Sequence, residues 1–519
     1  MMFLKKKINK KKQKKNRINI IKILFDINKK LDKKKIFYLI LFFLFLIVFF
    51  IRLFPFRVSY GWDEAVYLQH AEYFFNGKEN YNEFHIRPIF LSVIIAFFYN
   101  FYHNFIVPKI IISFFGALSF IFMFLIGKEL YNEKIGFLSS LFYGFMPFLV
   151  FYSKNIMTEI PSMAFFLIAI YLLIIYFKSQ KIKNHKKIII FFSGVFFGLS
   201  FLTRFSTLIL FIVLLLYLLL NTKKNFYLLL KKIIILSFGF FITLIPYLIW
   251  LYFKTGNLNI FINANKAVSD LNEPFYFYFA NFFNAYSFFL SITLFILIII
   301  YLKILINRLN KINKENKQKN HKKKNIIEKQ DFILFFWFFL YIVYISTIPH
   351  KEIRYLIPAI YPLFFLSGKS LYLIESYLSN LKKNLGFIFL LIFIFLFFIF
   401  SKNVFDIEKI NTYESDEIKV SKFLIDYATD LRNIDNKVTN FVIYSRFNHP
   451  VYALYTNFNV VPIYQKDFYK YYKRYMKEKG FFIYYKDLGD ENEDWLINNK
   501  DFKKILEKNN IVVFEYSIS

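Results

Sequence analysis

The chain contains no cysteine among its 519 residues. Disulfide bonds and thiolate metal ligands are therefore excluded, while the redox compartment stays undetermined. Acidic side chains are also scarce, with 35 aspartates and glutamates against 68 lysines and arginines, and the formal net charge is +33. Lysine is abundant together with Phe, Tyr, Ile and Asn, the residues that AT-rich codons encode. The charge is thus poor evidence for a nucleic acid partner, and we expect none.

What the chain has in excess is apolar residues. It is 57% hydrophobic and 23% aromatic. A soluble protein does not combine these values with such a charge, whereas a polytopic membrane protein with basic cytoplasmic loops does.

The N-terminus carries a long basic region, from Lys5 to Lys35. It is longer than the n-region of a signal peptide, and no small-residue cleavage site follows the next apolar run. We therefore predict a cytoplasmic arm over residues 1–35 followed by a retained membrane anchor.

Apolar runs of spanning length continue from Ile36–Leu53 to Leu385–Phe400. Since a spanning helix needs about 20 apolar residues, the pattern predicts about eleven spans in a membrane domain over residues 36–402. Lysine clusters fall in alternate loops, as the positive-inside rule requires of cytoplasmic loops. The N-terminus is then predicted inside a multi-pass cell-membrane protein, and the long first loop and everything after Phe400 outside.

Residues 403–519 change in character and predict a small extracytoplasmic α/β domain. No glycine-rich phosphate loop occurs in this segment, and we expect it to cover the membrane domain rather than to catalyse a reaction. Its predicted elements are a helix beginning at Pro450 and strands at Val438–Tyr444, Val460–Tyr464, Phe481–Tyr485 and Ile511–Tyr516.

Asp63-Glu64 follows the first predicted span directly. A carboxylate close to hydrocarbon is costly unless it is solvated, paired or used. The pair can cap a helix that begins near Ala65, and it can also provide a general base or a metal ligand.

Three further outer connections carry charged side chains. Arg87, before a proline and close to His85, is either an interfacial anchor or a ligand for an anionic group. Glu159 follows the helix cap Thr158 and serves either structural hydrogen bonding or substrate contact. Arg204 lies in a tight hairpin and either snorkels to the headgroups or contacts phosphate.

The densest cluster is His350-Lys351-Glu352-Ile-Arg354, between two apolar spans. Four ionisable groups in five residues are hard to explain as a solvated loop, so function is favoured over structure here. Positive groups on one face, opposed by a carboxylate pair, suit a lipid-linked phosphate leaving group and a hydroxyl nucleophile. The base would activate the acceptor while the cations stabilise charge on the phosphate.

With these motifs the chain resembles the C-type superfamily of integral-membrane glycosyltransferases, in the branch of the protein O-mannosyltransferases and lipid A aminoarabinose transferases. The resemblance covers roughly residues 36 to 400. The matching pieces are Asp63-Glu64, Arg87-Pro88, Thr158-Glu-Ile-Pro161, Gly198-Leu-Ser-Phe-Leu-Thr-Arg204 and His350-Lys-Glu-Ile-Arg-Tyr-Leu-Ile-Pro358.

The resemblance implies inverting transfer of a hexose or pentose from a polyprenyl- or dolichyl-phosphate donor to a hydroxyl of a protein, lipid or glycan. Asp63, with Glu64 beside it, would be catalytic, and the donor phosphate would be bound by Arg87, Arg204, His350, Lys351 and Arg354. His85, Glu159 and Glu352 are the candidate substrate contacts. The first outer loop would form two surface helices, Ala65–Phe75 and Pro88–Tyr102.

Some relatives bind a divalent metal through acidic motifs, but the carboxylates here are scattered and no clear Asp-x-Asp is present. We therefore expect chemistry without a metal or other cofactor. The competing class is a polytopic transporter of a lipid-linked or anionic substrate. Transporters tend to show internal repeats and broken helices at mid-membrane. This chain shows no evident repeat, and its polar clusters lie at the outer boundary, which favours the enzyme.

Overall fold

The computed structural model describes residues 34–56, 58–81, 83–84, 86–178, 186–222, 225–256, 273–287, 290–302, 328–400, 414–434, 441–463, 468–488 and 493–517. The predicted basic arm lies almost wholly outside these residues, as do the predicted boundary at residue 403 and the candidate site residue His85.

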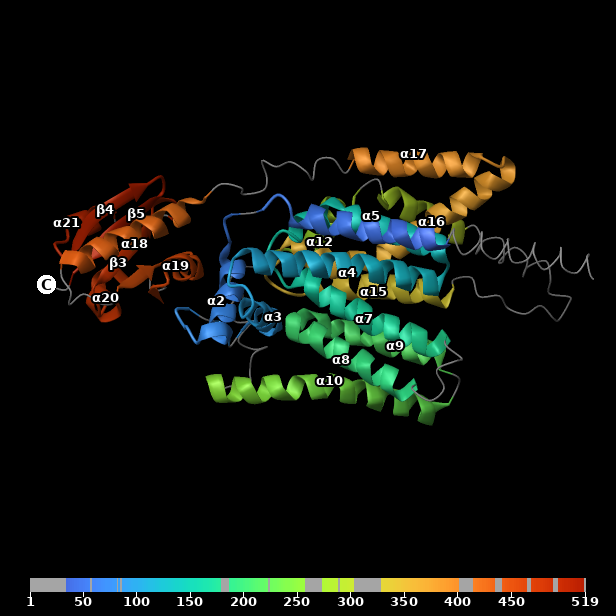
Figure 1. The fold of residues 1–519 in the computed structure, drawn as a ribbon, viewed down its shortest axis with the longest axis horizontal. Helices are drawn as coiled ribbons and strands as arrows, with labels where there is room; N and C mark the ends of the chain where they lie inside the picture. Colours follow the sequence, from blue (N-terminus) through green and yellow to red (C-terminus); the bar gives the residue numbers. More distant parts are fainter. Residues whose placement is uncertain are drawn as a thin grey trace, which may run out of the picture.

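The first part of the chain is a bundle of apolar helices that run side by side (Figure 1). Six described helices are long and apolar enough to cross a membrane, and shorter apolar helices lie among them. The C-terminal domain lies beyond one end of the bundle (Figure 1). We call this end the domain-side end and the opposite end the far end.

The long helices are Lys34–Leu53, α4 (Ile106–Leu130), α7 (Glu159–Lys178), α10 (Phe226–Thr255), α15 (Lys329–Ser346) and α16 (Ile357–Leu381). The shorter helices of the bundle are α5 (Glu133–Phe145), α6 (Pro147–Tyr152), α8 (Lys186–Thr203), α9 (Phe211–Asn221), Leu290–Leu302 and α17 (Leu385–Phe400).

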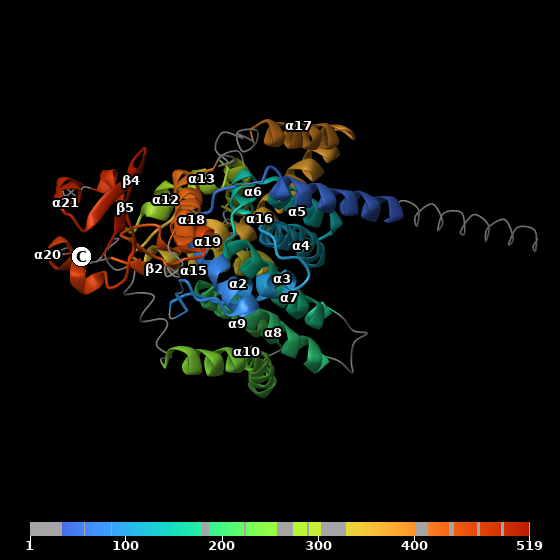
Figure 2. The ribbon, with the colours of Figure 1, turned by 60° about the vertical axis from the view of Figure 1, so that its left-hand side comes forward.

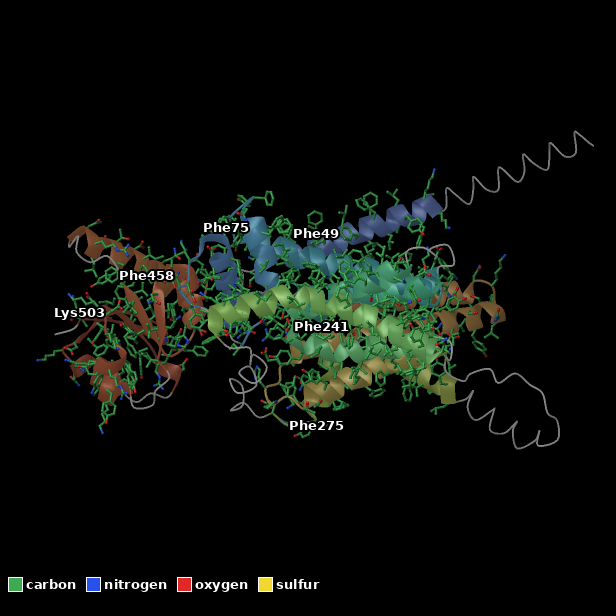
Figure 3. The ribbon with its side chains drawn as sticks, turned by 90° about the horizontal axis from the view of Figure 1, so that it is seen from below. Phe49, Phe75, Phe241, Phe275, Phe458 and Lys503 are labelled. Carbon is green, nitrogen blue, oxygen red and sulfur yellow. The ribbon has the colours of Figure 1, made fainter. Side chains whose placement is uncertain are left out.

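The outside of the bundle is apolar. Phe241 on α10 is 56% exposed, and Phe395 on α17 is 65% exposed. Figure 3 shows Phe241 among many aromatic side chains on this surface. Such a surface is unfavourable in water and suits hydrocarbon. The predicted polytopic membrane fold is confirmed, while the number of crossings stays a prediction.

Glycines allow α8 and α10 to pack closely. A Cβ atom on Gly194 would lie 2.0 Å from the carbonyl oxygen of Leu236, and one on Gly239 would lie 2.1 Å from that of Phe191. Gly198 continues the small-xxx-small spacing that brings helix backbones together in membranes.

The apolar run Ile135–Phe151, one of the predicted spans, is divided in the structure into α5 and α6. Pro147 has no N–H group, so the carbonyl of Tyr143 cannot receive the usual helical hydrogen bond. The guanidinium of Arg52 donates to the carbonyls of Tyr143 and Gly144, at 3.2 and 2.7 Å. This buried arginine therefore satisfies the backbone where the helix breaks.

The far end contains a buried ion pair that the sequence did not indicate. Asp331, at the start of α15, is fully buried and accepts a hydrogen bond from Lys369 of α16 at 2.7 Å. The hydroxyls of Tyr131 and Tyr301 donate to the same carboxylate. These contacts tie four helical segments together at the far end.

The C-terminal domain is a five-stranded sheet in the order β2-β1-β3-β5-β4. The first three strands in this order are parallel, and β5 and β4 pair antiparallel. The strands are β1 (Val442–Ser445), β2 (Asn459–Pro462), β3 (Gly480–Tyr485), β4 (Phe502–Lys508) and β5 (Ile511–Tyr516), and the helices are α18 (Asp416–Ile434), α19 (His449–Thr456), α20 (Phe468–Tyr475) and α21 (Glu493–Asn498).

The predicted α/β fold of this domain is confirmed, but β4 was missed. Its sequence, Phe-Lys-Lys-Ile-Leu-Glu-Lys, is largely charged because it lies at the edge of the sheet. Charged side chains are typical of edge strands, since they oppose pairing with another chain.

The first loop forms α2 (Trp62–Asn76) and α3 (Phe90–Tyr99), close to the two predicted surface helices. In Figure 1 both lie at the domain-side end of the bundle, with α2 between the bundle and the C-terminal domain, and in Figure 2 α2 lies beside α19 of that domain. Residues on α2 are therefore placed at the boundary between the two parts.

Candidate functional site

Asp63 lies in the first turn of α2, where the helix dipole favours a negative charge. One carboxylate oxygen, Oδ1, is 2.7 Å from Nη2 of Arg87, and the other, Oδ2, is 2.5 Å from Nη2 of Arg354. The two arginines belong to loops almost 270 residues apart in the sequence. The structure thus brings together three of the predicted site residues.

The two guanidinium groups determine the ionisation of Asp63. Burial alone would raise the pKa of this carboxyl, but the charges of Arg87 and Arg354 outweigh that effect and lower the pKa to about 2. The same interaction raises the pKa of Arg87. Asp63 is therefore ionised at any physiological pH.

Arg354 continues the network toward a second carboxylate. Its Nε lies 3.6 Å from Oε1 of Glu159, and Nη1 of Arg204 lies 2.9 Å from the same oxygen. Arg204 also donates to the Thr158 hydroxyl at 3.2 Å. The other carboxylate oxygen of Glu159, Oε2, is buried and has no hydrogen-bond partner among the residues that the structure describes. A buried acceptor without a donor is costly and marks a place for a ligand group.

The predicted His350–Arg354 cluster forms the corner before α16, and its side chains make two kinds of contact. Glu352 lies 2.5 Å from Nη2 of Arg354 and 3.0 Å from Nε2 of His350. Lys351 instead donates to the backbone carbonyls of Glu273 and Ile348, at 2.7 and 2.8 Å. Its ammonium group thus braces the backbone of the corner.

Glu64 is likewise occupied by the backbone. The carboxylate is fully buried, and its Oε2 accepts the N–H of Gly61 at 2.9 Å. Its Oε1 accepts the N–H of Ile156 at 2.8 Å. The side chain caps α2 and fastens the loop before α7 to it, so it is arranged as a structural group rather than as a base.

Glu83 is a contact that sequence analysis missed. Its carboxylate pairs with the guanidinium of Arg87 and accepts hydrogen bonds from Trp62 at 3.2 Å and Tyr81 at 3.0 Å. Its own N–H donates to Nε2 of His70 at 3.0 Å. The signal available was its spacing of four residues before Arg87, which allows a pair within one helical turn.

Tyr355 is a second missed residue. The Cζ atoms of Arg204 and Arg354 lie over its ring, at 4.9 and 5.5 Å from the ring centroid. Its hydroxyl donates to Glu352 at 3.2 Å. The ring therefore orients two of the three arginines.

The C-terminal domain contacts the residues around Glu83 through aromatic rings, among them that of His449. The buried His449 ring, at the start of α19, lies 5.1 Å from the Trp62 ring and 6.1 Å from the Tyr81 ring. Burial lowers the pKa of His449 to about 4, so the ring is neutral at physiological pH. The domain thus packs an uncharged ring against the residues that hold Glu83.

No group of three or more histidines and carboxylates with metal-ligand geometry occurs in the described part of the chain. In the site itself, each oxygen of Asp63 faces a guanidinium and each oxygen of Glu64 faces an N–H group.

Residues 86–250 match the family described as dolichyl-phosphate-mannose-protein mannosyltransferase. This segment contains Arg87, Glu159 and Arg204 but neither Asp63 nor Arg354. A search of curated protein sequences gave no match.

Among solved structures, the chain is similar to ArnT from Cupriavidus metallidurans bound to undecaprenyl phosphate. The TM-score is 0.65 at 11% identity, over 92% of this chain and 97% of that one. ArnT in the apo state gives a TM-score of 0.63 at 12% identity with the same coverage. The oligosaccharyltransferase AglB from Archaeoglobus fulgidus, in complex with an inhibitory peptide and a dolichol-phosphate, gives 0.53 at 10% identity, over 87% of this chain and 70% of that one. The predicted resemblance to the C-type superfamily and to this branch of it is confirmed, and it does not favour the transporter.

The low pKa of Asp63 predicts a specific pH dependence of stability. Since its folded pKa of about 2 lies below the ordinary value, its ionic contacts stabilise the fold above about pH 4, and this stabilisation is lost as the pH falls toward 2. The difference in melting temperature between the wild type and Asp63→Asn should therefore stay constant from pH 8 to 5 and shrink only below about pH 4.

The measurement is thermal unfolding of the detergent-purified proteins across this pH range. Asp426→Asn, at an exposed position on α18, is the control and should match the wild type throughout. A difference that already shrinks between pH 7 and 5 would contradict the pairing of Asp63 with two arginines.

Proposed function

We propose that the protein is a glycosyltransferase that moves a sugar, a hexose or a pentose, from a polyprenyl- or dolichyl-phosphate donor to a hydroxyl acceptor. The observation that carries the proposal is the placement of Asp63 between Arg87 and Arg354 at the domain-side end of a membrane bundle. A base and two phosphate ligands at membrane-surface depth suit a donor whose phosphate is attached to a lipid.

In the proposed reaction, Asp63 takes the proton of the acceptor hydroxyl. The hydroxyl oxygen attacks the anomeric carbon from the face opposite the phosphate, the carbon–oxygen bond to the phosphate breaks, and its electron pair leaves with the lipid phosphate. Arg87 and Arg354 stabilise the charge that develops on the leaving group. The configuration at the anomeric carbon is inverted.

The arginines also explain how a carboxylate with a pKa of about 2 acts as a base. When the donor phosphate takes up hydrogen bonds from Arg87 and Arg354, Asp63 shares its counter-charges with the phosphate. Its pKa then rises toward the range in which a carboxylate accepts a proton effectively. Base activation is thereby coupled to donor binding.

Glu159 and Arg204 supply the next contacts in this proposal. The unpartnered Oε2 of Glu159 is placed to accept a hydrogen bond from a sugar hydroxyl. Arg204 holds the other oxygen of Glu159. Glu352 pairs with Arg354, and His350 in turn contacts Glu352.

We further propose that transfer needs no metal ion, because the positive charge at Asp63 comes from two guanidinium groups. The experiment incubates the purified protein with a labelled polyprenyl-phosphate sugar and candidate acceptors in the presence of EDTA, and identifies the labelled product. Labelled product with the chelator present is the expected result.

Asp63→Asn should lower single-turnover transfer by about 10²- to 10⁴-fold, the usual contribution of a general base. Donor affinity should not fall, since the variant keeps both arginines and loses the carboxylate that competes with the phosphate. Transfer is followed with the labelled donor and affinity by equilibrium binding. Near-normal turnover by this variant would exclude Asp63 as the base.

Arg354→Ala should weaken donor affinity by about ten- to a hundredfold, the effect of losing one charge-assisted hydrogen bond. Arg354→Lys should restore only part of it, because an ammonium lacks the planar, two-pronged grip. Lys351→Ala is the matched comparison in the same corner. Because its ammonium group binds backbone carbonyls, this variant should lower the melting temperature and weaken donor affinity less than Arg354→Ala does. If Arg354→Ala and Lys351→Ala weakened donor affinity equally, the corner would affect donor binding only through its backbone conformation.

We also propose that the N-terminus is cytoplasmic and the domain-side end extracytoplasmic. Because the chain has no cysteine, single-cysteine variants report orientation without background. Thr429→Cys, on the exposed face of α18, should react with a membrane-impermeant maleimide in intact cells. Lys382→Cys, at the far end between α16 and α17, should react only after the membrane is opened. If Lys382→Cys reacted in intact cells and Thr429→Cys reacted only after the membrane was opened, the protein would have the opposite orientation.

A further inference from the structure

The turn from Glu83 to Arg87 determines how Arg87 enters the Asp63 network. The backbone N–H of Arg87 donates to the carbonyl of Glu83 at 3.0 Å, and the Glu83 carboxylate pairs with Nε of Arg87. Asp63 pairs with Nη2 of the same guanidinium, at 2.7 Å. Because the two carboxylates bind different nitrogens, a phosphate that displaces Asp63 from Nη2 leaves the Nε contact with Glu83 in place.

Glu83 is itself held by three contacts, and its side chain is only 7% exposed. Its carboxylate accepts the indole N–H of Trp62 at 3.2 Å and the hydroxyl of Tyr81 at 3.0 Å. Its backbone N–H donates to Nε2 of His70 at 3.0 Å. Two of these three contacts thus come from aromatic side chains that bind the carboxylate itself.

The C-terminal domain holds both of these aromatic side chains. The Trp62 ring lies 5.1 Å from the His449 ring and 6.1 Å from the Phe447 ring. Tyr81 packs against the buried apolar cluster that joins the sheet of the domain to α18 and α19. The groups that hold Glu83 are therefore themselves packed against the domain.

The domain also holds the backbone of the loop that leads to Glu83. The side-chain amide of Asn80 donates to Oδ1 of Asn457, at the end of α19, at 2.9 Å. The backbone N–H of Val460, in the edge strand β2, lies 3.5 Å from the carbonyl oxygen of Asn80. A movement of the domain away from α2 would therefore also release the loop before Glu83.

We propose that Glu83 is a positioning residue for Arg87, and that the C-terminal domain controls the lipid-phosphate affinity of the site by holding Trp62 and Tyr81 against Glu83. The ion pairs described for the Asp63 network all come from the membrane bundle and its loops, so the domain acts on them from outside. The inference deepens the proposed function and rests on its assignment of Arg87 to the donor phosphate.

The test measures equilibrium binding of polyprenyl phosphate without a sugar, the leaving group of the proposed reaction, to the purified full-length protein. Trp62→Phe keeps an aromatic ring against α19 but removes the N–H that Glu83 accepts. It should weaken binding about threefold to tenfold, the effect of one hydrogen bond.

Tyr455→Phe is the matched control. It also removes one hydrogen bond between the domain and the first loop, from the Tyr455 hydroxyl to the carbonyl of Val58 at 3.2 Å. Because that bond involves neither Glu83 nor the residues that hold it, this variant should bind polyprenyl phosphate as the wild type does.

Asn457→Gly tests the control from the domain itself. Asn457 has a φ of 62°, a conformation that glycine adopts without strain, so the variant removes only the side chain that Asn80 binds. It should weaken binding about twofold to fivefold. Hydrogen–deuterium exchange of peptides containing Glu83 and Arg87 should be faster in Asn457→Gly and Trp62→Phe, and unchanged in Tyr455→Phe.

Glu83→Gln separates positioning from competition between anions. A neutral amide holds a guanidinium less firmly than a carboxylate does, so a positioning role predicts weaker binding of polyprenyl phosphate. Tighter binding by Glu83→Gln would show that Glu83 only competes with the phosphate, and would overturn the positioning role.

Transfer of a labelled sugar is measured in parallel. Wild-type binding by both Trp62→Phe and Asn457→Gly, or equal weakening by Tyr455→Phe, would overturn the inference even if the wild type transfers sugar. If the wild type transfers no sugar while the pattern of binding and exchange among the variants holds, only the proposed reaction is refuted.

Discussion

The structure of the site depends on one interaction, the pairing of the Asp63 carboxylate with two guanidinium groups. Asp63 comes from α2, Arg87 from the loop that follows it, and Arg354 from the corner before α16. Each charge would be costly at this depth if it were alone. The first loop can therefore lie over the bundle only in an arrangement that brings all three together, and this requirement fixes the position of α2.

A second set of contacts holds that arrangement without entering it. Glu64 connects α2 to the loop before α7, and Lys351 fixes the backbone of the corner. Glu83 pairs with Nε of Arg87 while Asp63 pairs with its Nη2, and Trp62 connects Glu83 to His449 of the C-terminal domain. Such supporting contacts are what keep catalytic groups within the narrow range of productive geometry.

The sequence predicted the membrane fold and the α/β domain because the length of apolar runs and the pattern of apolar residues in strands can be read without knowledge of the tertiary structure. The charged motifs were all predicted to lie at one membrane boundary, and the family resemblance implied that Asp63, Arg87, Glu159, Arg204 and Arg354 belong to one site. The sequence did not separate Arg354 from Lys351, although both are cations of one corner. Which neighbour turns toward Asp63 depends on where the corner packs, and Lys351 meets the carbonyl of Glu273, distant in sequence. Glu83 and Tyr355 were missed for the same reason, because their roles exist only once Arg87 and Arg354 are in place.

The charge balance of the network has a consequence for how a donor enters it. Three arginines, at positions 87, 204 and 354, are matched by four carboxylates, those of Asp63, Glu83, Glu159 and Glu352. Among the described residues of this network, no positive charge is therefore left over for a phosphate while the donor is absent. A lipid phosphate must compete with these carboxylates for hydrogen bonds that are already made, so its binding replaces contacts rather than adding them. Asp63 would give up the most contacts in this competition, because both of its oxygens face arginines. One oxygen of Glu159, by contrast, has no hydrogen-bond partner among the described residues. In the proposed reaction, the arrangement that keeps this half-buried acid ionised in the resting protein would therefore also release it as a base when the donor binds.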